Sequence, residues 1–364
     1  MNVHELPMIL FTVIGQMSVG AFWTLGAIHL YGYSKKMSPE TIDRITNTAL
    51  YAAGPLLVLG FFAAFFHLHD PLHALNTLRH FNTSWLTREI SFGVLYGACG
   101  FVFAATQWFN IFTRQVREVF AGLTALAGLG LVVAMCGVYY SIETIPAWHT
   151  LATWFFFFGS TLLTGPLAVG ISLLVTWQIQ MRTAAVPTPA VASVVSSRAT
   201  GTAEAGGTPA PSGHDNHVVA VLKRLLLERV FTGHPTPEVS ALTARALQGI
   251  CLVSALSGMV LLVTYPIHIT NLANGNEAAQ EVAHRMMEGH YLLIRLVLLA
   301  AAVILAGIFA FIRARDAVTP SRALATIIVL AFALAVISEL LGRGLHYEGL
   351  WHVGLNTPQT LLGH

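Results

Sequence analysis

Long apolar segments alternate with short polar ones along most of the chain, and this alternation predicts the fold. A helix that crosses a membrane needs about 20 predominantly apolar residues. The pattern therefore predicts an all-α polytopic membrane protein, an eight-transmembrane-helix bundle. The eight predicted spans cover residues 8–31, 48–68, 89–111, 118–140, 149–178, 244–269, 289–312 and 322–345.

The composition supports this class. The chain is 55% hydrophobic and only 10% charged, whereas about 25% of the residues in a soluble domain are charged. The net charge of +2 is spread over short loops. Because no basic patch forms, we expect contact with membrane lipid and no nucleic-acid partner.

The regular spacing is interrupted once, between the fifth and sixth spans. Residues 183–215 are rich in Ala, Pro, Ser, Thr and Gly, which predicts a disordered linker. Residues 216–243 include an amphipathic stretch, which predicts either a helix on the membrane surface or a helix that continues into the sixth span. The chain thus divides into helices 1–5 (residues 1–182), the linker, this connector, and helices 6–8 with a tail (residues 244–364).

Basic residues predict the orientation. Of the nineteen lysines and arginines, thirteen lie in loops on the linker's side of the membrane and four on the other side. Cytoplasmic loops carry the excess of positive charge, so the linker should be cytoplasmic and both termini should face outward. The first apolar run lacks a preceding basic segment, which favours a retained span over a cleaved signal peptide.

Polar and charged residues inside the spans concentrate near their outer ends, whereas the midplane and inner leaflet have almost none. Such residues are costly in a membrane and often mark functional sites. Each also has a structural interpretation: Glu339 and Arg343 can pair on one helix face, Arg295 can extend to the headgroups, and Glu89 can favour a helix start. The candidates are Gln16, His67, Glu89, Tyr140, Arg295, Glu339 and Arg343.

The sequence offers no evident metal or haem site. Cys99, Cys136 and Cys251 lie in apolar runs without CxxC spacing, so they predict neither a zinc site nor an iron–sulfur cluster. No two of the sixteen histidines are predicted to face each other at mid-depth, where haem ligands are needed, and we expect no haem.

The distribution of polar residues also bears on the class of function. An ion pathway needs relay groups across the whole membrane, and a secondary transporter usually binds its substrate near the midplane. Neither pattern is visible. A single polar pocket near one surface suits a lipid-soluble substrate with a polar head, such as a quinol.

Several short motifs, in order along nearly the whole chain, resemble the DMSO reductase anchor subunit family (DmsC type). They are ELPMILFTVIGQ (5–16), FHLHDPLHALNTL (66–78), REI (88–90), VYYSIETIPAW (138–148), TGPL (164–167), Arg295 in IRLVLL and ELLGRG (339–344). The resemblance implies an eight-span anchor in the bacterial inner membrane, with periplasmic termini. It also implies a non-catalytic subunit of a molybdoenzyme complex for anaerobic respiration.

In that family, the anchor oxidises menaquinol and passes electrons to an iron–sulfur partner with 4Fe–4S clusters and a molybdopterin catalytic subunit. By motif position, the family's quinol-binding histidine and glutamate fall on His67 and Glu89. The other candidates, Gln16, Tyr140, Arg295, Glu339 and Arg343, either line this pocket or support the fold. Alternatives are a polysulfide-reductase-type quinone-reactive anchor, a non-redox transporter and an assembly scaffold.

Overall fold

The described part of the chain is all-α, as predicted. A computed structural model describes residues 6–65, 80–185, 236–315, 317–351 and 353, and no β-strand occurs among them. The helices are α1 (Leu6–Ser34), α2 (Pro39–Phe65), α4 (Trp85–Phe109), α5 (Arg114–Tyr140), α6 (Leu151–Ala185), α10 (Pro237–Ala273), α11 (Glu277–Met287), α12 (Tyr291–Ile304), η4 (Leu305–Ala310), α13 (Phe311–Arg315) and α14 (Arg322–Glu348).

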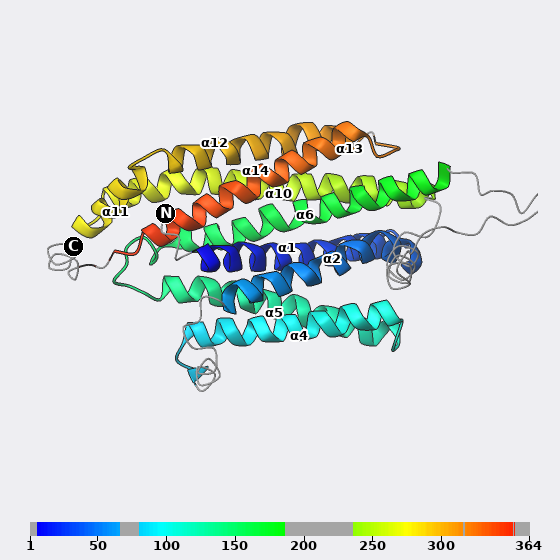
Figure 1. Ribbon diagram of the computed structural model, residues 1–364, viewed down its shortest axis with the longest axis horizontal. Coiled ribbons are helices and arrows are strands. Elements are labelled where there is room, and N and C mark those ends of the chain that lie inside the picture. Colours follow the sequence, from blue (N-terminus) through cyan, green and yellow to red (C-terminus); the bar gives the residue numbers. More distant parts are fainter. Residues whose placement is uncertain (1–5, 66–79, 186–235, 316, 352, 354–364) are drawn as a thin grey trace, which may run out of the picture.

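Seven rods in these ranges are long and apolar enough to cross a membrane, with α12, η4 and α13 counted as one. The 27-residue helix α2 is a further long rod, and the rods run side by side (Figure 1). Together they confirm the predicted eight-helix bundle. We call the end at which α1 begins and α14 ends the terminal end. The opposite end, where α6 ends and α10 begins, is the linker end (Figure 1).

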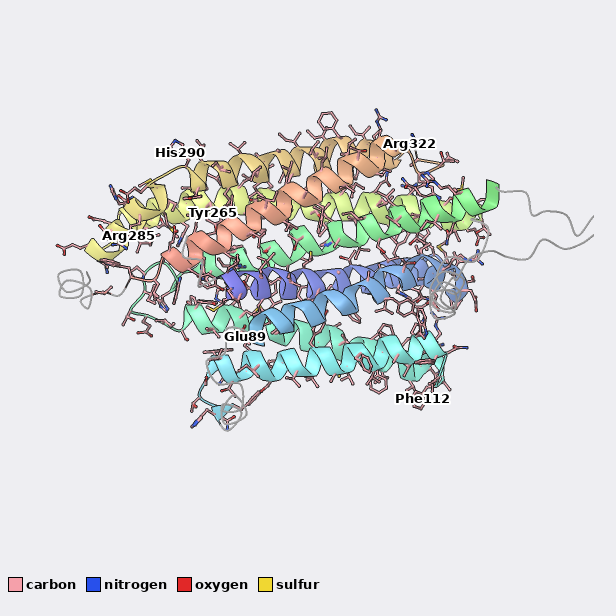
Figure 2. All side chains as sticks on the ribbon, viewed as in Figure 1. Glu89, Phe112, Tyr265, Arg285, His290 and Arg322 are labelled. Carbon is pink, nitrogen blue, oxygen red and sulfur yellow. The ribbon has the colours of Figure 1, made fainter. Side chains whose placement is uncertain are left out.

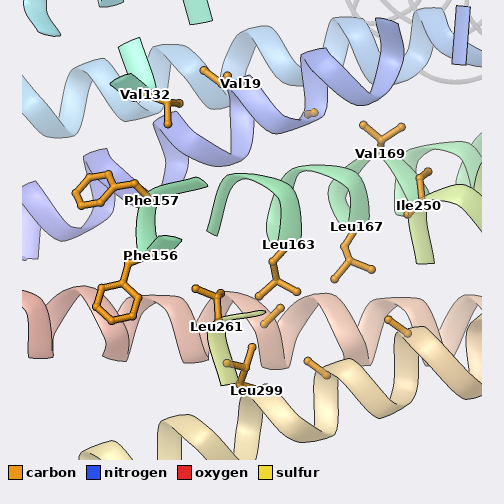
Figure 3. Packing of buried hydrophobic residues seen from close by; sticks show 14 of the residues in the cluster. Val19, Val132, Phe156, Phe157, Leu163, Leu167, Val169, Ile250, Leu261 and Leu299 are labelled. Carbon is orange, nitrogen blue, oxygen red and sulfur yellow. The ribbon is translucent and has the colours of Figure 1, made fainter. Parts of the chain in front are cut away.

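Helix α6 lies inside the bundle and contacts α1, α10 and α14. A Cβ atom on Gly20 of α1 would lie 2.0 Å from the carbonyl oxygen of Thr161, and one on Gly165 would lie 2.4 Å from the nitrogen of Ala21. Only glycine permits this close approach of two backbones, which is a common way for membrane helices to pack. Around this contact, larger apolar residues fill the core (Figure 3).

Helices α4 and α5 form a hairpin at one edge of the bundle (Figure 1). Asn110 ends α4 in the left-handed region, with φ 53°, a conformation that asparagine tolerates better than most residues. The hairpin exposes a broad apolar surface, including Phe101 and Leu126. Such a surface suits contact with lipid.

Two predicted boundaries and one predicted loop are wrong. Helix α2 begins at Pro39, nine residues before the predicted span, because its polar first turns continue the same helix. Helix α10 likewise begins at Pro237, where Thr236 caps it. Helix α11 occupies the expected loop between the sixth and seventh spans and buries Ala279, Val282 and Met286. The predicted linker 183–215 and the amphipathic helix lie almost wholly outside the described residues.

Candidate functional site

Glu89 points into the bundle from the terminal end of α4. Ser84 caps this helix by accepting a hydrogen bond from the Thr87 amide at 3.3 Å. Glu89, Gly93 and Tyr96 are buried, and their spacing of four and three residues places them on one helix face. The Glu89 side chain is only 9% exposed. It is therefore not a surface carboxylate that merely favours a helix start.

Two tyrosine hydroxyls meet in the same buried region of the bundle. The hydroxyls of Tyr139, near the end of α5, and Tyr347, on α14, are 3.1 Å apart and buried. Glu89 and Arg343 both act electrostatically on these tyrosines. The pair thus connects the hairpin with the last helix, in a region that also holds an acid and an arginine.

Arg343 of α14 binds a residue near the other end of the sequence. Its Nη2 donates to the side-chain oxygen of Gln16 at 2.9 Å, and its guanidinium carbon lies 3.6 Å from the centre of the Phe157 ring. All of these groups are buried. The contact brings two predicted site residues together, 327 positions apart.

Arg295 and Glu339 form a second buried pair. Their Nη2 and Oε1 atoms are 3.2 Å apart, and the side chains are 1% and 3% exposed. Arg295 also donates to the carbonyl of Ser338 at 3.1 Å and lies over the Tyr265 ring at 3.5 Å. Figure 2 shows Tyr265 and Glu89 towards the same end of the bundle, on α10 and α4.

This geometry corrects two predictions. Glu339 pairs with Arg295 on α12 instead of with Arg343 on its own helix, because α12 packs directly against α14. Arg295 does not extend to headgroups, since its side chain is enclosed between these helices. Gly342 makes room for it: a Cβ atom there would lie 2.3 Å from the Arg295 Nε atom.

Sequence reasoning selected Tyr140 and missed its neighbour. Tyr140 is half-buried and stacks on His149, whose Nδ1 lies 2.5 Å from the Tyr140 carbonyl oxygen. Tyr139 is the residue that faces the buried polar groups. Consecutive residues on a helix point about 100° apart, and nothing in the tyrosine pair itself shows which one faces inward.

A set of aromatic residues around His346 was not predicted. The Trp148 indole donates to the His346 carbonyl at 2.7 Å, and the Trp148 and Tyr139 rings contact the imidazole. His346 lies inside α14 and is 4% exposed, whereas the predicted eighth span ends at residue 345. The extension of α14 to Glu348 explains the difference.

Several buried polar atoms at the terminal end lack a hydrogen-bond partner among the described residues. They are Gln16 Nε2, Arg295 Nη1, Arg343 Nε and His346 Nε2. Buried polar groups are nearly always satisfied by protein, water or ligand. This part of the bundle therefore suits a ligand with oxygen atoms. His67, the predicted partner of Glu89, lies outside the described residues.

A second polar cluster, which was not predicted, lies at the linker end and joins residues of predicted spans with residues of predicted loops. Asp43 and Arg114 approach to 3.8 Å, and Arg114 pairs with Glu118 at 2.9 Å. His29 on α1 lines the same cavity as Asp43, Arg114 and Glu118, between α1, α2, α4 and α5. The reason is the early start of α2, which brings Asp43 from a predicted loop into the bundle.

The fold and these buried clusters define a polytopic α-helical membrane protein whose bundle encloses a polar site at one end. The sequence profile of the DMSO reductase anchor subunit (DmsC) family matches residues 1–350, and the chain belongs to this family. This match confirms the resemblance that the motifs indicated.

Known relatives agree with the family. The chain is 30% identical over 164 residues to a protein of the anaerobic dimethyl sulfoxide reductase of Escherichia coli, a match that covers 45% of this chain and 56% of the relative. It is 30% identical over 179 residues to the corresponding protein of Haemophilus influenzae, covering 48% and 60%. It is 27% identical over 145 residues to a sulfite dehydrogenase subunit of Allochromatium vinosum, covering 37% and 44%. The chain thus spans about half the length of these curated relatives.

Proposed function

We propose that this protein anchors a DMSO reductase-type complex in the membrane, binds menaquinol at the terminal end and delivers its electrons to a partner subunit. The observation that carries the proposal is the Glu89 carboxyl, which is almost fully buried in the region that also holds the Tyr139–Tyr347 hydroxyl pair. An acid in this position can accept a proton from a bound hydroxyl.

The proposed reaction removes two electrons and two protons from the quinol. The electrons leave for an iron–sulfur cluster of the partner, and Glu89 takes a proton from one quinol hydroxyl as that O–H bond breaks. His67, by its motif position, takes or relays the other proton. Tyr139 and Tyr347 orient the ring by hydrogen bonding, and the Gln16–Arg343 contact holds α14 against α1.

We assign the terminal end to the periplasmic side of the bacterial inner membrane. The excess of basic residues in loops at the linker end supports this assignment, since cytoplasmic loops are the basic ones. Protons from the quinol would then leave to the periplasm. The partners proposed on that side are an iron–sulfur subunit and a molybdopterin catalytic subunit.

The central test is Glu89→Gln in membranes that contain the chain and its partners. We expect assembly to persist and quinol-dependent acceptor reduction to fall by about 10²- to 10⁴-fold, the usual contribution of a general base. Reduction driven by an artificial donor that bypasses the quinol should be unchanged. Normal quinol oxidation by this variant would overturn the assignment.

A matched control is Glu281→Gln on α11, at the same end of the bundle. Glu281 is half-buried and pairs with Arg285 at 2.8 Å. The control removes a carboxylate and an ion pair near the proposed site but outside its buried groups. We expect quinol oxidation at the native rate, and an equal loss in both variants would indicate a general effect of charge.

The name of one relative, a subunit of a sulfite dehydrogenase, raises the opposite direction of electron flow. The same groups can donate protons to a quinone that receives electrons from a partner. Measuring both quinol oxidation and quinone reduction in the purified complex decides between them. A complex that reduces quinone and does not oxidise quinol would contradict the direction proposed here.

A further inference from the structure

A cavity lies at the linker end, on the far side of the membrane from Glu89. Its volume is about 440 Å³, and helices α1, α2, α4 and α5 enclose it. Ligand pockets in proteins typically measure about 300–1,000 Å³. On α1, the nearest cavity residue, Phe22, lies six positions beyond Gln16, which corresponds to about 9 Å at 1.5 Å per residue. His29, on the polar side of the cavity, lies thirteen positions beyond Gln16, or about 20 Å. The polar groups of the cavity are therefore distinct from those of the terminal-end site.

Small residues keep the cavity open. A Cβ atom added to Gly26 of α1 or Gly122 of α5 would meet no atom within 4 Å, and both residues line the space. Aromatic side chains form much of the wall: Phe22 and Phe103, whose ring centres lie 5.8 Å apart in an edge-to-face contact, and Trp23. A flat, apolar ring fits against such a wall.

The polar side of the cavity carries no surplus charge. Arg114 is neutralised by Glu118, at 2.9 Å, and by Asp43, at 3.8 Å, and the Tyr33 hydroxyl bonds to both Arg114 and Glu118. Arg117, the other basic residue of the wall, donates to the side-chain oxygen of Asn110 at 3.0 Å. With two arginines and two acids, the wall offers no net positive charge for a phosphate.

His29 and Asn47 supply hydrogen-bonding groups for an uncharged ligand. The Thr46 hydroxyl donates to the Ile42 carbonyl at 3.0 Å, so it accepts from His29 Nε2, also at 3.0 Å. In the neutral imidazole, Nδ1 is then an acceptor. The Asn47 oxygen accepts from Gln107 at 3.3 Å, which leaves its amide hydrogens as donors. His29 suits a hydroxyl that donates, and Asn47 suits a hydroxyl oxygen that accepts.

We propose that this cavity is a second binding site for a lipid-soluble quinol, with the ring against Phe22, Trp23 and Phe103, one hydroxyl donating to His29 and the other accepting from Asn47. The ligand class follows from the cavity's aromatic walls, its neutral charge balance and its paired donor and acceptor. The apolar outer faces of α1, α4 and α5 around it, including Leu30 and Leu126, suit entry of an isoprenoid tail from lipid.

The test uses the purified full chain in lipid nanodiscs under anaerobic conditions and a photoreactive azidonaphthoquinol with a short prenyl tail as the probe. Labelled peptides are mapped by mass spectrometry. We expect label in residues 22–33 and 103–125 of the native chain, and competition by unlabelled menaquinol but not by added phosphatidylglycerol. Gly122→Leu, which fills the cavity, should reduce this label by about tenfold or more, equivalent to about 1.4 kcal/mol.

Gly54→Leu on α2 is the matched control, because Gly54 also has open space around its Cβ position but does not line the cavity. It should retain native labelling. His29→Phe, which removes the proposed acceptor, serves as a second variant if Gly122→Leu does not fold. Absence of label from these peptides, unchanged label in the cavity variants, or displacement by phospholipid would overturn the proposal. Label near Glu89 reports separately on the terminal-end site.

Discussion

The buried Arg295–Glu339 pair allows structural support to be separated from quinol binding. In Glu339→Gln, the Arg295 guanidinium stays enclosed, with its side chain 1% exposed, and loses its counter-charge. At a separation of 3.2 Å and an effective dielectric constant of about 20, two unit charges attract by about 5 kcal/mol. Mutational experience with broken buried pairs gives about 3–5 kcal/mol.

We expect a loss nearer about 3 kcal/mol, because Arg295 keeps the Ser338 carbonyl and the Tyr265 ring. Removing both charges together, as Arg295→Met with Glu339→Leu, removes the desolvation cost as well. This double variant should lie within about 1 kcal/mol of the native protein or exceed it. Arg295→Met alone and Glu339→Leu alone complete a double-mutant cycle, whose coupling term isolates the pair.

The assay is unfolding of the purified chain in mixed micelles with increasing dodecyl sulfate, followed by tryptophan fluorescence. The reasoning fails if Glu339→Gln costs less than about 0.5 kcal/mol, the scale of an ordinary surface substitution, or if the double variant loses the sum of the two single losses. Quinol oxidation by the double variant then decides the role of the Arg295–Glu339 pair. Native activity would show that the pair supports the fold. Lost activity in a stable protein would show that the pair belongs to the proposed quinol site.

Three further changes test the structure through the free energy of unfolding in the same assay. Gly165→Ala should lower the free energy of unfolding by about 1–3 kcal/mol, because the new Cβ atom would lie 2.4 Å from the Ala21 nitrogen. Gly122→Ala is the control and should cause no such loss, because the space around its Cβ position is open. Ser84→Ala should lower it by about 1 kcal/mol through loss of the α4 cap, and Ser84→Asn should restore most of it. Gln16→Leu should cost about 1.5–3 kcal/mol, because it removes the acceptor 2.9 Å from buried Arg343; an unchanged midpoint would show that Arg343 finds another partner.

The helices could be predicted well because the membrane requirement acts on each span separately. A run of about 20 apolar residues is needed wherever a helix crosses, so length and hydropathy locate the rods without knowledge of their neighbours. The errors in the predicted boundaries lie where a helix continues past the apolar run that crosses the membrane. The first turns of α2, with Glu40 and Asp43, are polar and helical at once, and α11 buries only one narrow face.

The members of the terminal-end cluster could be predicted in large part, but not their partners. Each ionisable residue inside a span is costly to place in the membrane, and this cost alone marks Glu89, Arg295, Glu339 and Arg343 as candidates. Spacing along one helix favoured an ion pair between Glu339 and Arg343, whereas Glu339 pairs with Arg295 of α12. Which helices are neighbours depends on the packing of the whole bundle, including the close approach of Gly20 and Gly165.

The linker-end cavity was not predicted, for a related reason. His29, Asp43 and Arg114 come from three helices, and each alone resembles a polar residue at a span end. The glycines that keep the space open, Gly26 and Gly122, also carry no individual signal in a chain with 31 glycines. Only their meeting across α1, α2 and α5 makes a cavity.

The α4–α5 hairpin contributes to both proposed quinol sites. At the terminal end, it supplies Glu89, and its Tyr139 meets Tyr347 of α14 through their hydroxyls. At the linker end, Arg114 and Gly122 of the same hairpin line the cavity together with residues of α1 and α2. The hairpin forms one edge of the molecule (Figure 1), and its apolar outer surface, including Phe101 and Leu126, suits contact with the long apolar tail that the proposed ligand carries.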